Sequence, residues 1–415
     1  MAYVFLLGVI CMIYDDFIKE LKTKRKNYAV SQMKLATDLG ISRQYINEIE
    51  NGKVIPKDEL KEKILYELEK LNPNAPLFLL IDYFRVRFST TDVKEIIEKV
   101  LRIKFNYLNY EEYGFYSYEN HYAIGNIFIM VSKDISKGVL VELKGQGCRQ
   151  MESYLIAQGR SWYDFMLDCL IAGGIMKRID LAINDRVGIL NIPELTQKCR
   201  NEECISYFRS FKSYRTGELK MRKDKEFMGN TLYIGSLKSE LYFCIYEKDY
   251  EQYFKNGISI EDSEIKNRFE IRLKNERAYH AVVDLITYRD AEHTAFSIIN
   301  HYVRFVDKNT TISKSKWKIN NRWAWFIGEN RKPLKLTSQP EPYTIQKTLS
   351  WLSKQVAPTL KMIIEYDNQN NTTIFKDMIN NTRLNNKQKQ FLERQNIDIK
   401  EIISIDTINK EINNL

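Results

Sequence analysis

The sequence predicts an α+β protein, with a small helical domain at the N-terminus and a larger domain of strands and helices after it. Apolar residues recur at helical spacing in short segments up to residue 71. After Pro76 the pattern changes to β-rich runs that alternate with amphipathic helices. A stretch rich in Asn and Pro separates the two patterns and predicts a boundary. We therefore expect domains over residues 1–75 and 76–340, followed by a helical C-terminal extension over residues 341–415.

Composition limits the classes of partner and the cellular location. The chain has 415 residues and a formal net charge of +9, which favours a polyanionic partner without excluding others. Six cysteines form no CxxC pair, so neither a zinc site nor a disulfide framework is indicated. The apolar run over residues 1–13 lacks a basic n-region and is too short to span a bilayer. These features favour a cytoplasmic protein without membrane insertion.

Residues 31–53 have the spacing of a helix-turn-helix. Gly40 supplies the sharp turn after the first helix, and Ser42 is a good N-cap for the second. The segment resembles the repressor-like DNA-binding domains, in which the second helix enters the major groove. The resemblance implies that Gln44 reads a base edge, as glutamine does on adenine. The residues expected to face the groove are Ser42, Arg43, Gln44, Tyr45 and Asn47. A protein-interaction module is the alternative.

A strand expected over residues 139–144 runs into a glycine-containing turn before a helix near Gln150. The pair Gly145 and Gly147 could cradle a phosphate at the helix N-terminus, assisted by Arg149. An ordinary tight turn explains the same residues.

The run over residues 176–190 contains an apolar strand that ends before Asp185, and Asp180 lies in it on the face opposite Ile179 and Leu181. A buried aspartate must be paired or bind a cation. Asp185 could join it in holding a hard divalent metal through oxygen ligands. A structural salt bridge with Arg178 or Arg268 is the alternative.

Residues 209–226 mix cations with aromatic side chains, which suits single-stranded DNA. A solvated loop explains the run equally well. The residues concerned are Arg209, Phe211, Lys212, Tyr214, Arg215 and Lys220.

Residues 230–252 predict two strands, over 231–234 and 240–246, joined by a short polar turn. This placement brings Tyr233 to the mouth of the turn, with Lys238 close enough in sequence to meet a phosphate. Half-buried packing is the other use of a strand tyrosine. In the next strand, Arg268, Glu270 and Arg272 share one face, which should line a polar site or face solvent.

The remaining segments say less about function. We expect the tryptophans at 317, 323 and 325 to pack in the core rather than stack on DNA. One or two amphipathic helices are expected over residues 343–366, and exposed helices or a flexible arm from Asn368 onward.

Three motifs in order, RIDLAIND, NTLYIGSLKSELYFCIYEK and NRFEIRLKN, closely resemble the Rep_trans proteins. That family comprises replication initiators of rolling-circle plasmids and related relaxases of integrative conjugative elements. A helix-turn-helix ahead of this domain resembles the relaxases of the MOBT group. The resemblance implies an antiparallel sheet with flanking helices, as in rolling-circle initiators.

The resemblance also implies a reaction, in which a tyrosine attacks DNA at an origin of transfer and leaves a 5′-phosphotyrosyl enzyme. Its expected nucleophile is Tyr233, with Tyr242 and Tyr246 as rivals. Candidates for binding the scissile phosphate are Lys238, Arg178 and Arg268. Because the four histidines have no HxH spacing, carboxylates should hold Mg²⁺ or Mn²⁺. The first choices are Asp180, Asp185 and Glu270, followed by Glu142 and Glu247.

The implied partners are double- and single-stranded DNA, a helicase and a coupling ATPase of the conjugation machinery, and a second copy in a homodimer. Two other functions fit the sequence. One is a rolling-circle plasmid replication initiator with the same chemistry. The other is a non-enzymatic transcriptional regulator.

Overall fold

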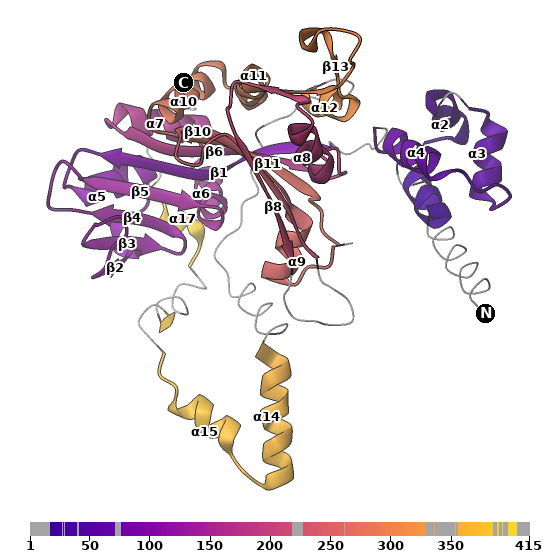
Figure 1. The fold of residues 1–415 in the computed structure, drawn as a ribbon. Helices are drawn as coiled ribbons and strands as arrows, with labels where there is room; N and C mark the ends of the chain where they lie inside the picture. Colours follow the sequence, from indigo (N-terminus) through magenta and orange to yellow (C-terminus); the bar gives the residue numbers. More distant parts are fainter. Residues whose placement is uncertain are drawn as a thin grey trace, which may run out of the picture.

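The computed structural model describes residues 17–70, 76–217, 227–328 and 356–384, except 27, 29, 40 and 261, and also residues 336, 353, 388–389, 392 and 397–404. The predicted apolar run at 1–13, Lys220 and half of the helical segment expected at 343–366 lie outside these residues. The α+β class is confirmed (Figure 1). Within the described part of the chain, no helix is both long enough and apolar enough to cross a bilayer.

The N-terminal helices form their own small core. After a helix over residues 17–26 come α2 (Gln32–Leu39), α3 (Arg43–Glu50) and α4 (Asp58–Lys70). Leu35, Ile46 and Ile64 are fully buried together. Ser42 caps α3, since its side chain accepts a hydrogen bond of 3.1 Å from the Tyr45 amide. The predicted helix-turn-helix is therefore confirmed.

The larger domain is built on one ten-stranded sheet in which every neighbouring pair is antiparallel, as the resemblance implied. In spatial order the strands are β2 (Asn109–Glu111), β3 (Asn120–Ile124), β4 (Ile127–Val131), β5 (Val139–Lys144), β1 (Leu77–Phe88), β6 (Ile175–Asp185), β11 (Asn267–Lys274), β10 (Leu241–Glu247), β9 (Phe227–Ile234) and β8 (Phe211–Gly217). A small second sheet has the order β13 (Lys318–Ile319), β12 (Val303–Asp307) and β7 (Cys204–Ser206).

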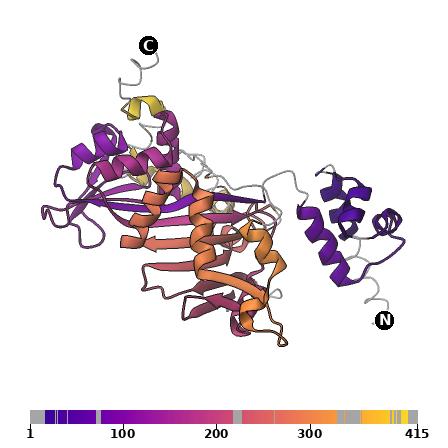
Figure 2. The ribbon, with the colours of Figure 1, turned by 90° about the horizontal axis from the view of Figure 1, so that it is seen from above.

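Helices cover one face of the large sheet, and Figure 2 shows α10 and α11 lying across the strands. Alternate strand residues such as Ile179, Leu181 and Ile183 point into this core, where Trp323 and Trp325 are also buried as predicted. The helical elements are α5 (Val93–Glu95), η1 (Ile96–Leu101), η2 (Phe105–Tyr107), α6 (Gln146–Ala157), α7 (Trp162–Ile171), α8 (Ile192–Arg200), α9 (Lys248–Asn256), α10 (Asn275–Tyr288), α11 (Ala291–Tyr302), η3 (Lys314–Lys316) and α12 (Asn321–Ile327).

The opposite face of the sheet carries the other set of alternating residues, including Tyr83, Asp180 and Glu270. We call it the polar face. The strand β1 changes register here, because Ile81 pairs with Leu181 whereas Tyr83 pairs with Asp180. The extra residue, Asp82, forms a bulge in the middle of the sheet.

The C-terminal region contains α14 (Ala357–Asn370), α15 (Ile374–Asn381) and α17 (Ile399–Ile402). Exposed side chains predominate on α14, and also on α15, which lies where exposed helices were expected. The segment after them behaves differently. Ile403 is 1% exposed, belongs to the main core and forms an antiparallel bridge with Ile103. The division into three domains stays a prediction.

Candidate active site

Charged side chains from β6, β10 and β11 meet on the polar face. The strand register places Arg272 beside Asp180 on one side and beside Tyr242 on the other. One row along, Glu270 lies between Ala182 and Cys244. The alternation that put Asp180, Glu270 and Arg272 on polar faces in the sequence thus brings them together in space.

Glu270 accepts hydrogen bonds at both carboxylate oxygens. The Tyr246 hydroxyl donates to Oε1 at 2.9 Å. The Arg272 guanidinium donates to Oε2 through Nε at 2.8 Å and Nη2 at 2.6 Å. Burial and the negative charge of Glu270 raise the pKa of Tyr246 well above its usual value. The phenol is therefore protonated at rest, with a carboxylate placed to accept its proton.

Asp180 is the second buried carboxylate of the cluster, only 3% exposed. Arg178 donates to it through two hydrogen bonds of 2.8 and 2.6 Å, and Arg272 Nε lies 3.8 Å away. Burial raises the pKa of Asp180 to about 6, although these arginines oppose the shift. The salt bridge with Arg178, which was the predicted alternative to metal binding, is thus present. It does not exclude a metal-binding role for Asp180.

Arg268 joins the cluster through residues that sequence reasoning missed. Its Nε donates to Asn184 Oδ1 at 2.7 Å, and Nη1 donates to Asp82 Oδ1 at 3.0 Å. Nη1 also lies 3.9 Å from Glu270. Asp82 could have been found from the sequence, because it interrupts an apolar run over residues 77–81 and 83–84. The same pattern singled out Asp180.

Three carboxylates and three guanidinium groups balance in charge: Asp82, Asp180 and Glu270 against Arg178, Arg268 and Arg272. A phosphodiester entering this cluster adds one negative charge, so a divalent cation would compensate it. Mg²⁺ is commonly held by one or two carboxylates plus phosphate oxygens, and Asp180 with Glu270 fits that donor set. In the part of the chain that the structure describes, no three His, Cys, Asp or Glu side chains group as a complete protein-only metal site.

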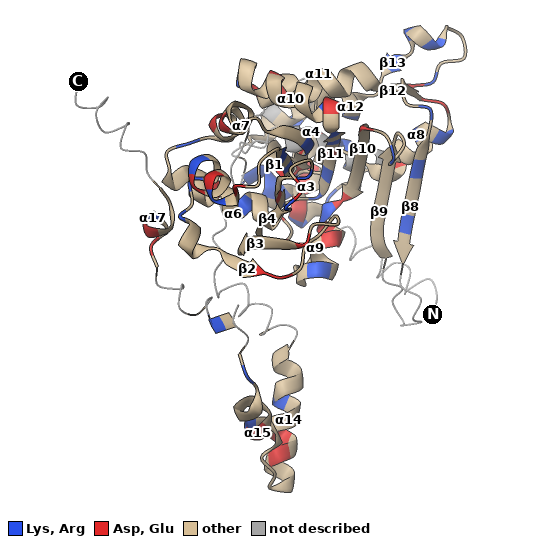
Figure 3. Cartoon of the chain, turned by 90° about the vertical axis from the view of Figure 1, so that its left-hand side faces the viewer, with Lys and Arg blue, Asp and Glu red and all other residues tan. Residues whose placement is uncertain are grey.

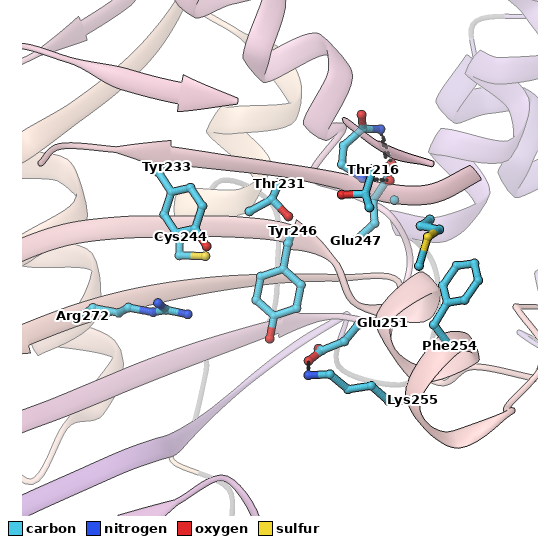
Figure 4. Close-up of a pocket in the computed structure, with 13 residues that line it drawn as sticks. Thr216, Thr231, Tyr233, Cys244, Tyr246, Glu247, Glu251, Phe254, Lys255 and Arg272 are labelled. Carbon is cyan, nitrogen blue, oxygen red and sulfur yellow. Dashed lines mark hydrogen bonds and ion pairs between the residues drawn. The ribbon is translucent and has the colours of Figure 1, made fainter. Parts of the chain in front are cut away.

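A cavity of about 310 Å³ adjoins this cluster. Figure 4 shows Tyr246 in its middle, between Arg272 and Glu251, whereas the hydroxyl of Tyr233 lies by the Cys244 sulfur. Burial, with the Cys244 thiol beside it, raises the pKa of Tyr233 to about 12. The lining residues are Thr216, Met228, Gly229, Asn230, Thr231, Tyr233, Cys244, Tyr246, Glu247, Glu251, Phe254, Lys255 and Arg272.

The three candidate tyrosines have different surroundings. Tyr246 faces a carboxylate, and Tyr233 faces a thiol whose own pKa burial raises to about 12. Tyr242 is 5% exposed, and the Lys274 ammonium lies 5.0 Å from its ring centroid. Of the three, Tyr246 combines access to the cavity with a proton acceptor.

Asp185 does not join the carboxylate cluster as predicted. It has the opposite parity to Asp180 on a regularly paired stretch of β6, so its side chain points away from the polar face. Its oxygens accept from the amides of Val187, Gly188 and Leu190 at 3.1, 2.8 and 2.9 Å. The carboxylate shapes the turn after β6, on the other side of the sheet from Asp180.

The lower-ranked acidic candidates also lie apart from Asp180. Glu142 lies on β5, two strands from β6, and accepts hydrogen bonds from Tyr83 and Tyr116. Glu247 accepts from the Asn230 amide at 2.6 Å. Lys238 lies exposed in the turn between β9 and β10, at the opposite end of β10 from Tyr246.

Close packing explains part of the glycine turn, and its role as a phosphate cradle stays a prediction. Helix α6 begins at Gln146, earlier than expected, and an added Cβ on Gly147 would lie 2.4 Å from the Asn126 carbonyl oxygen. Close packing against the β3–β4 turn therefore accounts for this glycine. Arg149 is 7% exposed, donates to the Ile81 carbonyl and pairs with Glu152 at 2.9 Å.

The expected DNA-binding side chains on α3 are accessible. Arg43, Gln44 and Asn47 are exposed, and Tyr45 is partly exposed. The strand β8 forms one edge of the sheet, and Figure 3 shows its basic residues in blue. Its Tyr214 ring meets Tyr233 edge-on at 5.9 Å, and Arg215 lies 5.3 Å from the Phe227 ring.

Known proteins share this architecture. A solved structure described as a rolling-circle replication initiator protein from Geobacillus stearothermophilus matches with a TM-score of 0.53 and 23% identity, over 63% of this chain and 99% of that one. Family models for the rolling-circle replication initiation protein N-terminal domain and for a helix-turn-helix match residues 78–168 and 21–65. The larger domain therefore has the fold of a rolling-circle replication initiator.

The family model for replication initiation factors, Rep_trans, matches residues 174–379. A Bacillus subtilis (strain 168) protein named "Putative DNA relaxase NicK" is 42% identical over 331 residues, which cover 79% of this chain and 93% of that protein. The chain belongs to the Rep_trans replication initiation factor family, which confirms the resemblance seen in the three motifs.

Proposed function

We propose that this protein is a DNA relaxase that nicks one strand at an origin of transfer and holds the cut end as a tyrosyl ester. The hydrogen bond from Tyr246 to Glu270, beside Asp180 and three arginines, is the observation that carries the proposal. A phenol protonated at neutral pH needs a base to become a nucleophile. The carboxylate in contact with its proton meets that need.

In the proposed reaction, Glu270 accepts the Tyr246 proton as the phenolic oxygen attacks phosphorus. The bond from phosphorus to the 3′ oxygen breaks and the 5′ phosphate stays on tyrosine. The 3′ oxygen leaves as a hydroxyl by taking a proton from water, and Glu270 returns the tyrosine's proton to water. Arg268 and Arg272 place positive charge beside the phosphate and hold Glu270 in position. A Mg²⁺ or Mn²⁺ ion held by Asp180 and Glu270 would polarise the scissile phosphate.

The Tyr246 assignment replaces the expected nucleophile, Tyr233, on geometric grounds. Tyr233 lines the same cavity and lies beside Tyr214 at the sheet edge. Those contacts suit a residue that stacks on or positions the DNA strand.

We place the enzyme in the cytoplasm, where it starts conjugative transfer and rolling-circle replication of an integrative element. In this proposal α3 contacts double-stranded DNA near the origin, and the polar face holds the single strand. A helicase, a coupling ATPase and a second copy of the chain are the proposed partners. The solved initiator of the same fold supports a replication initiator as the second candidate function.

The decisive experiment uses a supercoiled plasmid carrying the intergenic DNA that flanks the coding sequence. Wild-type protein should relax it in Mg²⁺ but not in EDTA, and leave a denaturant-resistant protein–DNA adduct on the peptide that contains Tyr246. Tyr246→Phe should form no adduct, whereas Tyr233→Phe should form it at lower yield. Tyr279→Phe, on the helical layer, is the matched control. An adduct mapped to Tyr233 would overturn the Tyr246 assignment. If neither the wild type nor any variant nicked the plasmid, the proposed relaxase activity would be wrong.

A further inference from the structure

Three exposed aromatic rings gather in the loop between β2 and β3, away from the proposed nucleophile. Tyr113, Phe115 and Tyr116 are 56%, 44% and 49% exposed. Phe115 packs edge-on against Phe128 of β4 at 6.1 Å. Phe128 pairs with Glu142, so both belong to the polar face, and the loop therefore lies over that face.

Tyr116 is held in a fixed and costly conformation. Its φ is +58° and that of Ser117 is +62°, in the left-handed region that such residues rarely adopt. The Tyr116 hydroxyl donates to Glu142 at 2.7 Å, and Glu142 is 1% exposed. Tyr83 donates to the same carboxylate. A strained backbone persists where the surrounding contacts determine it, and here those contacts orient an exposed ring.

Cations surround this ring. The Arg85 guanidinium lies 4.9 Å and the Lys144 ammonium 5.7 Å from the Tyr116 ring centroid. Lys144 pairs with Glu142 at 2.9 Å, yet its side chain is 53% exposed. Two cations against one carboxylate leave a net positive charge beside the exposed rings. We call Arg85, Phe115, Tyr116 and Lys144 the Tyr116 patch.

The Tyr116 patch continues directly into the carboxylate–arginine cluster. Tyr83, which shares Glu142 with Tyr116, pairs in register with Asp180. The Arg178 guanidinium stacks on the Tyr83 ring at 4.1 Å and also binds Asp180. The patch strand β5 is two strands from β6, a span on the order of 10 Å across the sheet.

We propose that the Tyr116 patch is a binding platform for the single strand that passes over the proposed nicking site. Bases would stack on Phe115 and Tyr116 while Arg85 and Lys144 contact phosphates. Aromatic rings interleaved with cations are how proteins hold single strands without reading sequence. The proposal rests on the proposed function, because it extends the DNA path from Tyr246 to β5.

The test measures binding without cleavage, using a fluorescently labelled 20-nucleotide oligothymidylate in EDTA. Tyr116→Asn should weaken binding about tenfold, the loss expected for one stacked base. Asparagine suits this position because it tolerates a positive φ. Lys144→Gln should flatten the plot of log affinity against log salt by about 0.7, the value for one phosphate contact. Iodouracil at successive positions should crosslink to the peptide that holds Phe115 and Tyr116.

Tyr279→Asn and Lys99→Gln remove the same groups from the helical layer and should bind like the wild type. Tyr246→Phe should also bind the oligonucleotide with wild-type affinity. The binding test therefore gives a result for the Tyr116 patch even if Tyr246 is not the nucleophile. Melting temperatures identify variants that fail to fold, and Phe115→Ala provides a second test of stacking. Wild-type affinity in both Tyr116→Asn and Phe115→Ala, or no binding by the wild type, would overturn the proposal.

Discussion

The Tyr246 hydroxyl donates a hydrogen bond of 2.9 Å to Glu270 Oε1 across two paired strands, whereas the Tyr233 hydroxyl lies by the Cys244 thiol. Both tyrosines line one cavity. What separates them chemically is the proton acceptor.

Glu270→Gln should slow adduct formation by about 10² to 10⁴, the usual contribution of a general base. Glutamine retains the size of the side chain and an oxygen that accepts from Tyr246, but it cannot hold the proton. Single-turnover kinetics on a saturating nicking substrate measure the effect. Glu276→Gln, an exposed substitution on α10, is the control. Wild-type rates for Glu270→Gln would exclude the carboxylate as the base.

Adduct formation should depend on pH through Asp180. Burial raises its pKa to about 6, so the carboxylate is ionised above that pH and protonated below it. At subsaturating Mg²⁺, the single-turnover rate should rise up to about tenfold per pH unit below pH 6 and level off above it, because only the ionised carboxylate binds the ion. Rates measured from pH 5 to 8 test this. A flat profile would mean that the charge of Asp180 is not required.

Asp180→Asn and Asp185→Asn should have different effects, although both residues were expected to bind metal. Asp180→Asn should raise the Mg²⁺ concentration for half-maximal nicking more than about tenfold, since even outer-shell substitutions cost that much. Asp185→Asn should lower the free energy of unfolding by about 1–3 kcal/mol through weakened hydrogen bonds to the turn amides. Magnesium titrations and urea unfolding separate the two. A raised Mg²⁺ requirement in Asp185→Asn alone would reverse the assignment.

Gly147→Ala should destabilise the larger domain by about 1–3 kcal/mol, as overpacking does. The added carbon would lie 2.4 Å from the backbone oxygen of Asn126, which cannot move as a side chain does. Urea unfolding checks the value. Gly217→Ala meets no atom within 4 Å and should cause little change. Equal stability of the two variants would show that α6 can shift away from β4.

Gln44→Ala should relax base preference on duplex DNA by about 1–3 kcal/mol at one position and leave single-strand nicking intact. The side chain is exposed on α3 and donates a local hydrogen bond of 3.0 Å to Glu48. Selection from a randomised duplex library gives the preference. Lys19→Gln removes an exposed charge outside α3, and its base preference should match the wild type. An unchanged preference in Gln44→Ala would argue for α3 as a protein contact.

Local patterns predicted much of the fold. The runs of β-forming residues at 77–88 and 139–144 became β1 and β5 with the expected bounds, and Ser42 caps α3. Alternation alone placed Asp180 and Glu270 on polar faces. The start of α6 was predicted too late because glycines next to a strand usually indicate a loop. Gly147 is instead a helical residue that packs closely against the backbone of Asn126.

The composition of the site required strand register, which local patterns do not contain. Tyr246 reaches Glu270 because β10 and β11 pair in the register that sets Cys244 against Glu270. Asp185 turned away because β6 extends through it and the chain then folds back onto its carboxylate. The bulge at Asp82, which delivers a third carboxylate, likewise depends on how β1 meets β6.

The bridge between Ile103 and Ile403 also has a consequence for biosynthesis. Lys104 donates its amide to the Ile402 carbonyl at 2.9 Å, so segments made early and late in translation share one backbone pairing. A ribosome has already released strand β1 and helix α6 when it synthesises residue 403. The apolar surface that Ile403 covers stays exposed in the growing chain until then, and this part of the domain can close only after residue 403 has left the ribosome.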